Sequence, residues 1–266
     1  MQHATTGRPA SWIEGLTRFG YATRGVVFSV IGLLGLRVAA GLGGRAQGTE
    51  GALREIGHQP FGQILLGITA VGLASYVLWR FLQAMLNPVN QDDGLVPRLA
   101  IAGSGVFYSV LALTAAQLAF DVRVGTNIRR HLIDWAFSKP LGGWLVGLVG
   151  VVLIAIGLHA IYRGIMTTFM DLYPQGRMNR AKEQVARRIG QVGLTALGLT
   201  LCITGGLVIR GASLASLDDN VGIGGALEAL GAQPYGPWLL GVTALGFVAY
   251  GFHCFALARY RLLIKS

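Results

Sequence analysis

Three residues at repeated spacing could carry chemistry: Trp79, His159 and His253. His159 follows Trp79 by 80 residues and His253 follows it by 174, and the same offsets align long apolar segments elsewhere in the chain. Two imidazoles on facing helices can ligate a haem or a metal ion, or relay a proton. A histidine can also act as an amphipathic ring at the membrane boundary, as tryptophan does. Because Trp79 holds the third position, the sequence favours the interfacial role and predicts no cofactor.

No catalytic motif accompanies these rings. The glycine-rich run Ala40–Gly44 looks like a nucleotide-binding loop, but no strand–helix–strand unit surrounds it. The chain has no Walker lysine motif, no HExxH and no GxSxG. The sequence therefore predicts a protein that is not an enzyme, with neither catalytic residues nor a dedicated metal site.

The elements that position these residues are membrane helices. Of 266 residues, 53% are hydrophobic and only 13% are charged, against about 25% charged residues in soluble domains. Six apolar runs are long enough to span a bilayer, which takes ~20 residues each. Because these runs are continuous rather than alternating, they predict helices rather than strands. They are Phe19–Leu42, Phe61–Leu86, Leu99–Phe120, Leu141–Tyr162, Ile189–Ile209 and Tyr235–Leu257.

Self-comparison shows that the six runs form three copies of a two-helix unit. The segment Pro60-Phe61-Gly62 aligns with Pro140-Leu141-Gly142 and with Pro234-Tyr235-Gly236 at the same two offsets. The predicted fold is all-α: an integral membrane protein with six transmembrane helices from three tandem helical hairpins. Its predicted parts are a cytoplasmic leader (1–17), repeat one (18–90), repeat two (91–170), a basic cytoplasmic loop (171–187) and repeat three with a short basic tail (188–266).

Each first helix begins with a short head motif. Repeat one begins with Arg18-Phe-Gly-Tyr-Ala-Thr-Arg-Gly-Val-Val-Phe28, and we align Arg188-Ile-Gly-Gln-Val-Gly-Leu194 with it, so that Leu194 stands in place of Arg24. Together with the Gln-Pro-(Phe/Tyr)-Gly element before the second helix, the first motif resembles domain of unknown function 1206. That bacterial family carries three copies of a two-helix unit. The resemblance implies this fold and an inner-membrane location, and it implies no activity.

The charge distribution predicts the orientation of the chain. The net charge of +10 would suggest nucleic acid in a soluble protein, but here the basic residues lie between apolar runs. Of 22 Lys and Arg residues, we assign 14 to the side of the two termini and 8 to the other side. Both termini are therefore predicted to be cytoplasmic, and nucleic acid is excluded as a partner. Arginines after the second helices are predicted to reach lipid headgroups: Arg80, Arg163 and Arg259.

Glycines in the second helices are predicted to let helices pack closely, and a glycine-lined permeation groove is the alternative. These glycines are Gly67, Gly72, Gly143, Gly147, Gly241 and Gly246. Two short amphipathic stretches, Gly51–Gly57 and Gly225–Gly231, are predicted to lie flat at the membrane interface with their apolar sides toward the lipid.

These features favour a non-enzymatic scaffold or accessory subunit that binds membrane lipids, a partner membrane protein or a second copy of itself. A small carrier or channel is the first alternative, although the chain lacks the helices broken by Gly or Pro that many carriers have. A redox protein with His159 and His253 as cofactor ligands is the second alternative.

Overall fold

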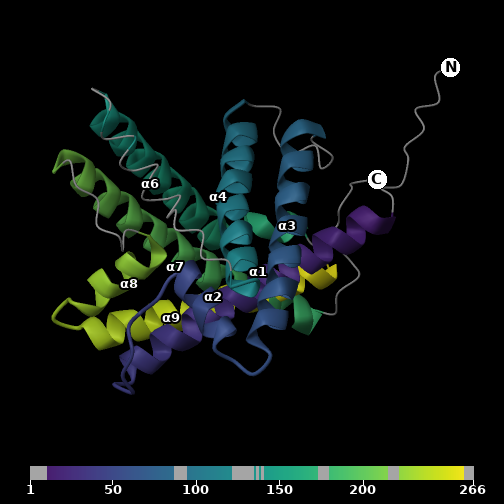
Figure 1. The fold of residues 1–266 in the computed structure, drawn as a ribbon, viewed down its shortest axis with the longest axis horizontal. Coiled ribbons are helices and arrows are strands. Elements are labelled where there is room, and N and C mark those ends of the chain that lie inside the picture. The colour runs from purple at the N-terminus through teal and green to yellow at the C-terminus, as the bar shows by residue number, and fades with distance from the viewer. Residues whose placement is uncertain are drawn as a thin grey trace.

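The protein is described by a computed structural model that covers residues 11–86, 95–121, 135, 138, 141–172, 180–214 and 222–260. Its regular structure is helical throughout these residues (Figure 1). The six long helices are α1 (Ser11–Ala39), α3 (Gly62–Leu86), α4 (Leu95–Ala119), α6 (Gly142–Met166), α7 (Arg180–Ser213) and α9 (Gly236–Tyr260). The short ones are α2 (Thr49–Gly57), η1 (Thr168–Leu172) and α8 (Ile223–Gly231).

The predicted all-α membrane fold is confirmed, because each of the six long helices contains a stretch long and apolar enough to cross a bilayer. Two predicted limits differ from the structure. α7 begins at Arg180, within the predicted 171–187 loop, and α1 begins at Ser11, within the predicted leader. The charged residues Arg180, Lys182, Glu183 and Arg187 sit on the first turns of a helix that continues into the membrane span.

The long helices pack most closely between repeats rather than within them. α3 packs along α4, α6 along α7 and α9 along α1, so the second helix of each repeat contacts the first helix of the next, in cyclic order. Figure 1 shows these as three pairs that run in different directions. Contacts of α1 with α3 and of α7 with α9 link the pairs into a ring. α4 and α6 make no extended contact among the described residues, so the ring is open at repeat two.

Glycines seven residues apart bring α6 and α7 into backbone contact. A Cβ added to Gly205 would lie 2.5 Å from the carbonyl oxygen of Gly150, and one on Gly157 would lie 2.6 Å from that of Gly198. The interface between α1 and α9 has the same design, since a Cβ on Gly32 would lie 2.7 Å from the carbonyl oxygen of Ala244. Small residues therefore set how closely the paired helices approach, as is usual where lipid surrounds the helices.

The glycines predicted to pack from sequence meet different surroundings. Gly72 and Gly246 are closely packed, because a side chain there would overlap Thr23 and Ala196 respectively. Three others lie at ordinary contact distance from the opposite helix: Gly143, Gly147 and Gly241. Gly67 has no atom within 4 Å of the place its Cβ would take, so the predicted packing role is wrong for Gly67.

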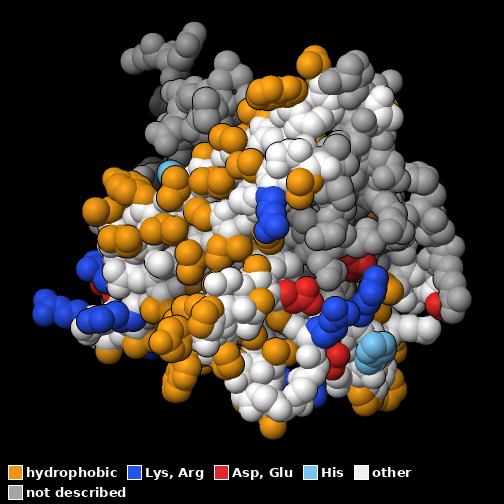
Figure 2. All heavy atoms as spheres, turned by 90° about the vertical axis from the view of Figure 1, so that its left-hand side faces the viewer, with side chains coloured by type: hydrophobic (Ala, Val, Ile, Leu, Met, Phe, Trp, Pro, Cys, Tyr) orange, Lys and Arg blue, Asp and Glu red, His pale blue; other side chains and the backbone are white. Residues whose placement is uncertain are grey.

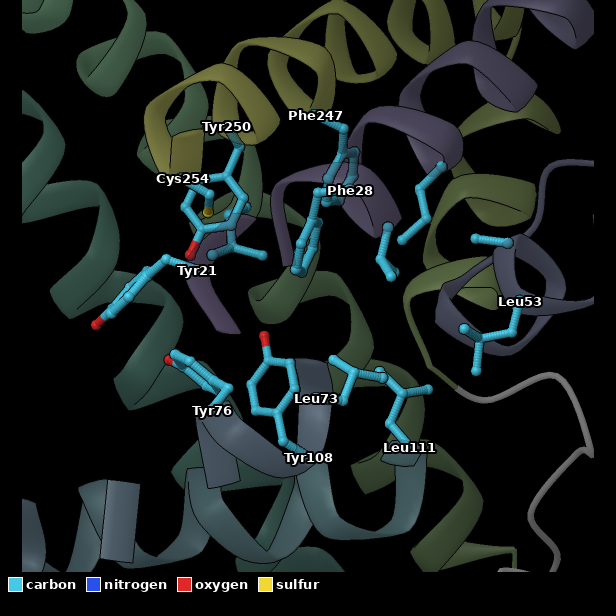
Figure 3. Packing of buried hydrophobic residues seen from close by; sticks show 14 of the residues in the cluster. Tyr21, Phe28, Leu53, Leu73, Tyr76, Tyr108, Leu111, Phe247, Tyr250 and Cys254 are labelled. Carbon is cyan, nitrogen blue, oxygen red and sulfur yellow. The ribbon is translucent and has the colours of Figure 1, made fainter. Parts of the chain in front are cut away.

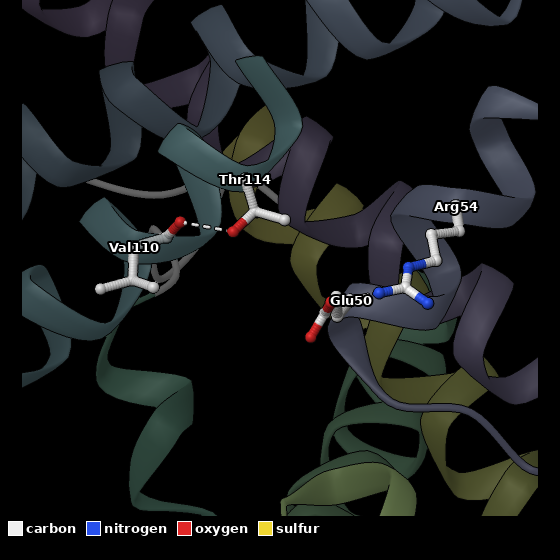
Figure 4. Close-up of polar contacts among 4 residues, drawn as sticks. All are labelled: Glu50, Arg54, Val110 and Thr114. Carbon is white, nitrogen blue, oxygen red and sulfur yellow. Dashed lines mark hydrogen bonds and ion pairs between the residues drawn. The ribbon is translucent and has the colours of Figure 1, made fainter. Parts of the chain in front are cut away.

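The short helices α2 and α8 cover one end of the ring. Their leucines Leu53 and Leu227 are both 0% exposed, so the apolar faces pack on protein. The prediction that these faces turn toward the lipid is therefore wrong. α2 contacts three long helices, α1, α3 and α4, and its N-terminal end meets that of α8. The outer side of α2 carries the ion pair of Glu50 and Arg54 (Figure 4). Figure 4 also shows a hydrogen bond within α4, which the hydroxyl of Thr114 donates to the carbonyl oxygen of Val110.

Apolar side chains cover much of the outer surface. On the face drawn in Figure 2 hydrophobic side chains are spread widely, while most of the charged ones gather in the lower part of the view. α6 is the most outward-facing span, with Trp144, Leu148 and Leu158 all exposed. A surface of this kind suits a lipid environment, because large exposed apolar areas are rare on soluble proteins.

Candidate site at Arg24

A half-buried arginine lies among α1, α3, α4 and α9, well inside the span Glu14–Ala39 of α1. The Cζ atom of Arg24 is 5.1 to 5.5 Å from the centroids of four aromatic rings, contributed by four helices. These rings belong to Phe28 of α1, Tyr76 of α3, Tyr108 of α4 and Tyr250 of α9. Figure 3 shows the rings of α3 and α4 on one side of the core and those of α1 and α9 on the other. We call these four rings the aromatic cage.

Repeat symmetry builds the aromatic cage. Tyr76 and Tyr250 occupy equivalent positions at the offset of 174, and Phe28 and Tyr108 do so at the offset of 80. The rings also pair edge to face, with centroids 4.9 Å apart for Phe28 and Tyr250 and 4.8 Å apart for Tyr76 and Tyr108. Such pairs stabilise one another beyond the apolar area they bury. The cage thus joins residues from all three repeats around one cation.

No carboxylate neutralises Arg24. Three ion pairs occur among the described residues, and none includes it: Arg18–Glu14, Arg45–Glu228 and Arg54–Glu50. An arginine at the middle of a membrane helix costs about 2.5–3.5 kcal/mol to insert on translocon scales. A desolvated cation–π contact contributes about 2 kcal/mol, so four rings offset this cost. The aromatic cage can therefore hold the charge by itself.

The hydrogen-bonding capacity of Arg24 is less completely used. Its Nη1 donates to the hydroxyl of Tyr76 at 2.7 Å, whereas its buried Nε has no hydrogen-bond partner among the described residues. A buried donor without a partner costs about 1–3 kcal/mol. The edge formed by Nε and Nη2 is the planar fork that binds carboxylate or phosphate oxygens in pairs. The arrangement is therefore suited to holding an oxyanion.

Sequence reasoning missed Arg24, because the charge count assigned every arginine to one side of the membrane. The signal was present, since a cation several residues inside an apolar run is costly there and marks a functional candidate by default. The equivalent aromatic positions were also readable from the repeat offsets. That the rings converge on the arginine depends on helix pairing, which the sequence reading did not predict.

The structure separates the residues of the predicted histidine column. His253 is 3% exposed and packs edge to face on Phe169, with 5.1 Å between the ring centroids. Trp79 is also buried, whereas His159 is exposed on α6. α6 packs on α7 and has no extended contact with α9, so the two imidazoles are not brought together. An interfacial role fits the exposure of His159 and is wrong for the buried His253 and Trp79.

We expect His253→Trp to destabilise the protein and His159→Trp to leave its stability unchanged. A Cβ on Gly190 would already lie 3.1 Å from the Nδ1 of His253, so no room exists for a larger ring, and overpacking costs about 1–3 kcal/mol. Exposed substitutions usually change stability by less than ~0.5 kcal/mol. Thermal unfolding of both variants in detergent checks this, and equal melting temperatures would contradict it.

The arginines predicted to contact headgroups also differ among themselves. Arg80 is half-buried, with its Cζ 5.3 Å from the ring of Tyr76 and a hydrogen bond of 3.3 Å from Nη1 to Gln83, so part of its guanidinium contacts protein and its contact with headgroups stays a prediction. Arg163 is half-buried near the end of α6. Arg259 is exposed at the end of α9, in a position that suits headgroup contact.

Comparison with known proteins identifies the repeats independently. The family model Domain of Unknown Function (DUF1206) matches residues 19–87, 99–167 and 192–261. An uncharacterized protein of Bacillus subtilis (strain 168), YxxB, is 31% identical over 245 residues, which cover 91% of this chain and 89% of that protein. No solved structure matches the chain.

The family match corrects the alignment of the third head motif. The repeats begin at 19, 99 and 192, so Leu197 is the counterpart of Arg24, not Leu194 as aligned from Arg188. The structure agrees with this register. A Cβ on Gly20 would lie 2.8 Å from the Cα of Tyr76, and one on Gly193 would lie 2.6 Å from the Cα of Tyr250. Repeats two and three thus carry Ser104 and Leu197 where repeat one carries its arginine.

Proposed function

Because the chain belongs to the DUF1206 family, which carries no assigned activity in its description, we propose a function from the Arg24 site itself. The protein is a non-enzymatic, multi-pass membrane protein that binds the anionic group of a membrane lipid at Arg24. The observation that supports this proposal is that, in the part of the chain that the structure describes, the buried Nε has no hydrogen-bond partner and the aromatic cage includes no carboxylate. A lipid is favoured over a partner protein as the ligand because the cage lies between the helices rather than on the outer surface.

We expect wild-type protein purified in mild detergent to retain anionic lipid, and Arg24→Gln to lose it. Losing a hydrogen bond to a charged group costs about 1.5–3 kcal/mol, which corresponds to a drop in affinity of about ten- to a hundredfold. Native mass spectrometry of the protein, with titration of anionic and zwitterionic lipids, measures the retained lipid and its affinity.

Arg54→Gln is the matched control, since it removes an exposed arginine from the outer side of α2 and leaves the aromatic cage intact. Its lipid binding should equal that of the wild type. If Arg24→Gln stays folded by circular dichroism and still binds anionic lipid as the wild type does, the proposed function is wrong.

We further propose that the protein resides in the bacterial plasma membrane with both termini in the cytoplasm, as the charge distribution predicts. A reporter active only in the periplasm should be silent when fused after Ser266 and active when inserted at Gly43. Gly43 suits the insertion because it lies in the connection after α1 and no atom comes within 4 Å of where its Cβ would lie. An active fusion at the C-terminus would reverse the orientation.

A further inference from the structure

Helices α4 and α6 lack the contact that their counterparts make. In repeat one α1 packs on α3, and in repeat three α7 packs on α9. In repeat two the described residues of α4 and α6 have no such extended contact, although the repeats share one plan. Among the described residues, the ring of helix contacts is therefore open between these two apolar helices.

The residues at the missing contact are complementary in size. Thr23 of α1 fills the space over Gly72 of α3, and Ala196 of α7 fills the space over Gly246 of α9. The equivalent positions in repeat two are Gly103 on α4 and Val152 on α6. Here the glycine is on the first helix of the repeat and the larger residue is on the second, the reverse of repeats one and three.

Both members of this third pair are free in the structure. Among the described residues, no atom outside the nearby backbone of α4 lies within 4 Å of where a Cβ on Gly103 would be, and Val152 is 48% exposed. A glycine opposite a valine is the complement in size that a contact between α4 and α6 would require.

A second set of equivalent positions points the same way. Tyr76 and Tyr250 are buried against the backbone of Gly20 and Gly193, whereas their counterpart Ile156 on α6 is 38% exposed. If α6 packed on α4 as α3 packs on α1, Ile156 would occupy the third position around Arg24.

We propose that the opening between α4 and α6 is a lateral portal through which a long-chain carboxylate, a fatty acid, reaches Arg24, and that α6 then closes on α4 through Gly103 and Val152. This inference rests on the proposed function and names its ligand. The carboxylate is planar and matches the edge of the guanidinium that Nε and Nη2 form.

The walls of the portal favour an amphiphile over a free anion. Exposed side chains whose counterparts in repeat one are buried between α1 and α3 are apolar, among them Phe107 of α4 and Val149 and Val152 of α6. An acyl chain buries against such walls, while a small hydrated anion gains nothing there. A glycerophospholipid would bring ester and glycerol oxygens to an aromatic lining that offers them few donors, and burying polar groups without partners is costly.

The first experiment tests closure by disulfide cross-linking in native membranes. The pair Gly103→Cys and Val152→Cys is introduced into a chain whose own Cys202 and Cys254 are replaced by alanine. A Cβ on Gly72 would lie 2.7 Å from the Cβ of Thr23, and one on Gly246 would lie 2.2 Å from the Cβ of Ala196. Closure of the same kind therefore brings the Cβ atoms at positions 103 and 152 at least as close as the 3.5–4.5 Å of a disulfide. We expect efficient cross-linking with a mild oxidant.

The matched control is the pair Val106→Cys and Val151→Cys on the same two helices. Its counterparts Val26, Val71, Leu199 and Leu245 are all exposed, so closure should not bring this pair together. Absence of the cross-link at 103 and 152, or equal cross-linking of the control pair, would contradict closure.

The second experiment measures binding of radiolabelled palmitate to the cysteine variant in nanodiscs of phosphatidylcholine. We expect a cross-link formed beforehand to slow palmitate uptake at least tenfold, and reduction to restore it. Unlabelled acetate and phosphatidylglycerol serve as competitors, and neither should displace palmitate at equal concentration.

The outcomes separate the two proposals. If Arg24→Gln abolishes palmitate binding but the cross-link does not slow it, the portal is wrong and the proposed function stands. If phosphatidylglycerol or acetate competes equally, the assignment to a fatty acid is wrong. If Arg24→Gln binds every anionic lipid as well as the wild type, the proposed function fails as well.

Discussion

Gly205→Leu is expected to detach α6 from the rest of the protein. The glycine lies at the backbone contact between α6 and α7, and even one added carbon would lie 2.5 Å from the carbonyl oxygen of Gly150. Neither backbone can yield without separating the helices. Because α7 is the one long helix with which α6 has extended contact among the described residues, separation leaves α6 without support. Thermal unfolding in detergent should show a loss of well over the 1–3 kcal/mol typical of overpacking.

The neighbouring residue gives the control for this substitution. Gly206 is in the same turn of α7, but no atom lies within 4 Å of where its Cβ would be. Glycine to leucine raises the helix propensity equally at positions 205 and 206, by ~1 kcal/mol in favour of the helix. We expect Gly206→Leu to be neutral or slightly stabilising. Equal melting temperatures of the two variants would show that the glycine contact does not govern assembly.

Arg24→Glu is expected to prevent folding, whereas Arg24→Leu is expected to leave a folded protein. The faces of aromatic rings carry negative partial charge, so the aromatic cage that attracts a guanidinium repels a carboxylate. Leucine is already present and buried at the equivalent position, Leu197 of repeat three. Expression level, size-exclusion profile and thermal unfolding of the two variants check this difference.

A protein in which Arg24→Glu and Arg24→Leu unfold at the same temperature would contradict the cation–π account of the cage. Tyr108→Leu in the Arg24→Leu background supplies a further check. If the ring of Tyr108 acts mainly through the cation, its removal should cost less stability there than in the wild type. A double-mutant cycle measures that coupling directly.

Hydropathy was sufficient to predict the six spans, because the bilayer requires long apolar helices whatever their tertiary contacts. Pairing was not predicted, because a hairpin of adjacent helices and a pair from neighbouring repeats have the same hydropathy. The seven-residue spacing of Gly150 and Gly157 on α6, matched by Gly198 and Gly205 on α7, was the readable signal for that pairing.

The candidate site shows a different limit of the sequence. Charge counting treats Arg24 as a flanking residue, although its position inside an apolar run contradicts that reading. The third head motif was aligned three residues too early, because Arg188-Ile-Gly imitates Arg18-Phe-Gly within helix α7. α7 carries both Gly190 and Gly193, and the rotation of the helix about its axis decides which of them contacts Tyr250 of α9. Packing fixes that rotation, and composition does not.

The pairing of α1 with α9 has a consequence for biosynthesis. α1 leaves the ribosome before α9, the helix with which it packs most extensively, and Arg24 receives one ring of its cage, Tyr250, from α9. A nascent chain that ends before Gly236 therefore holds an arginine in the bilayer with its enclosure incomplete. The early spans must stay together near the insertion machinery until synthesis of α9 is finished, so truncation at the C-terminus should expose the whole chain to quality-control proteolysis.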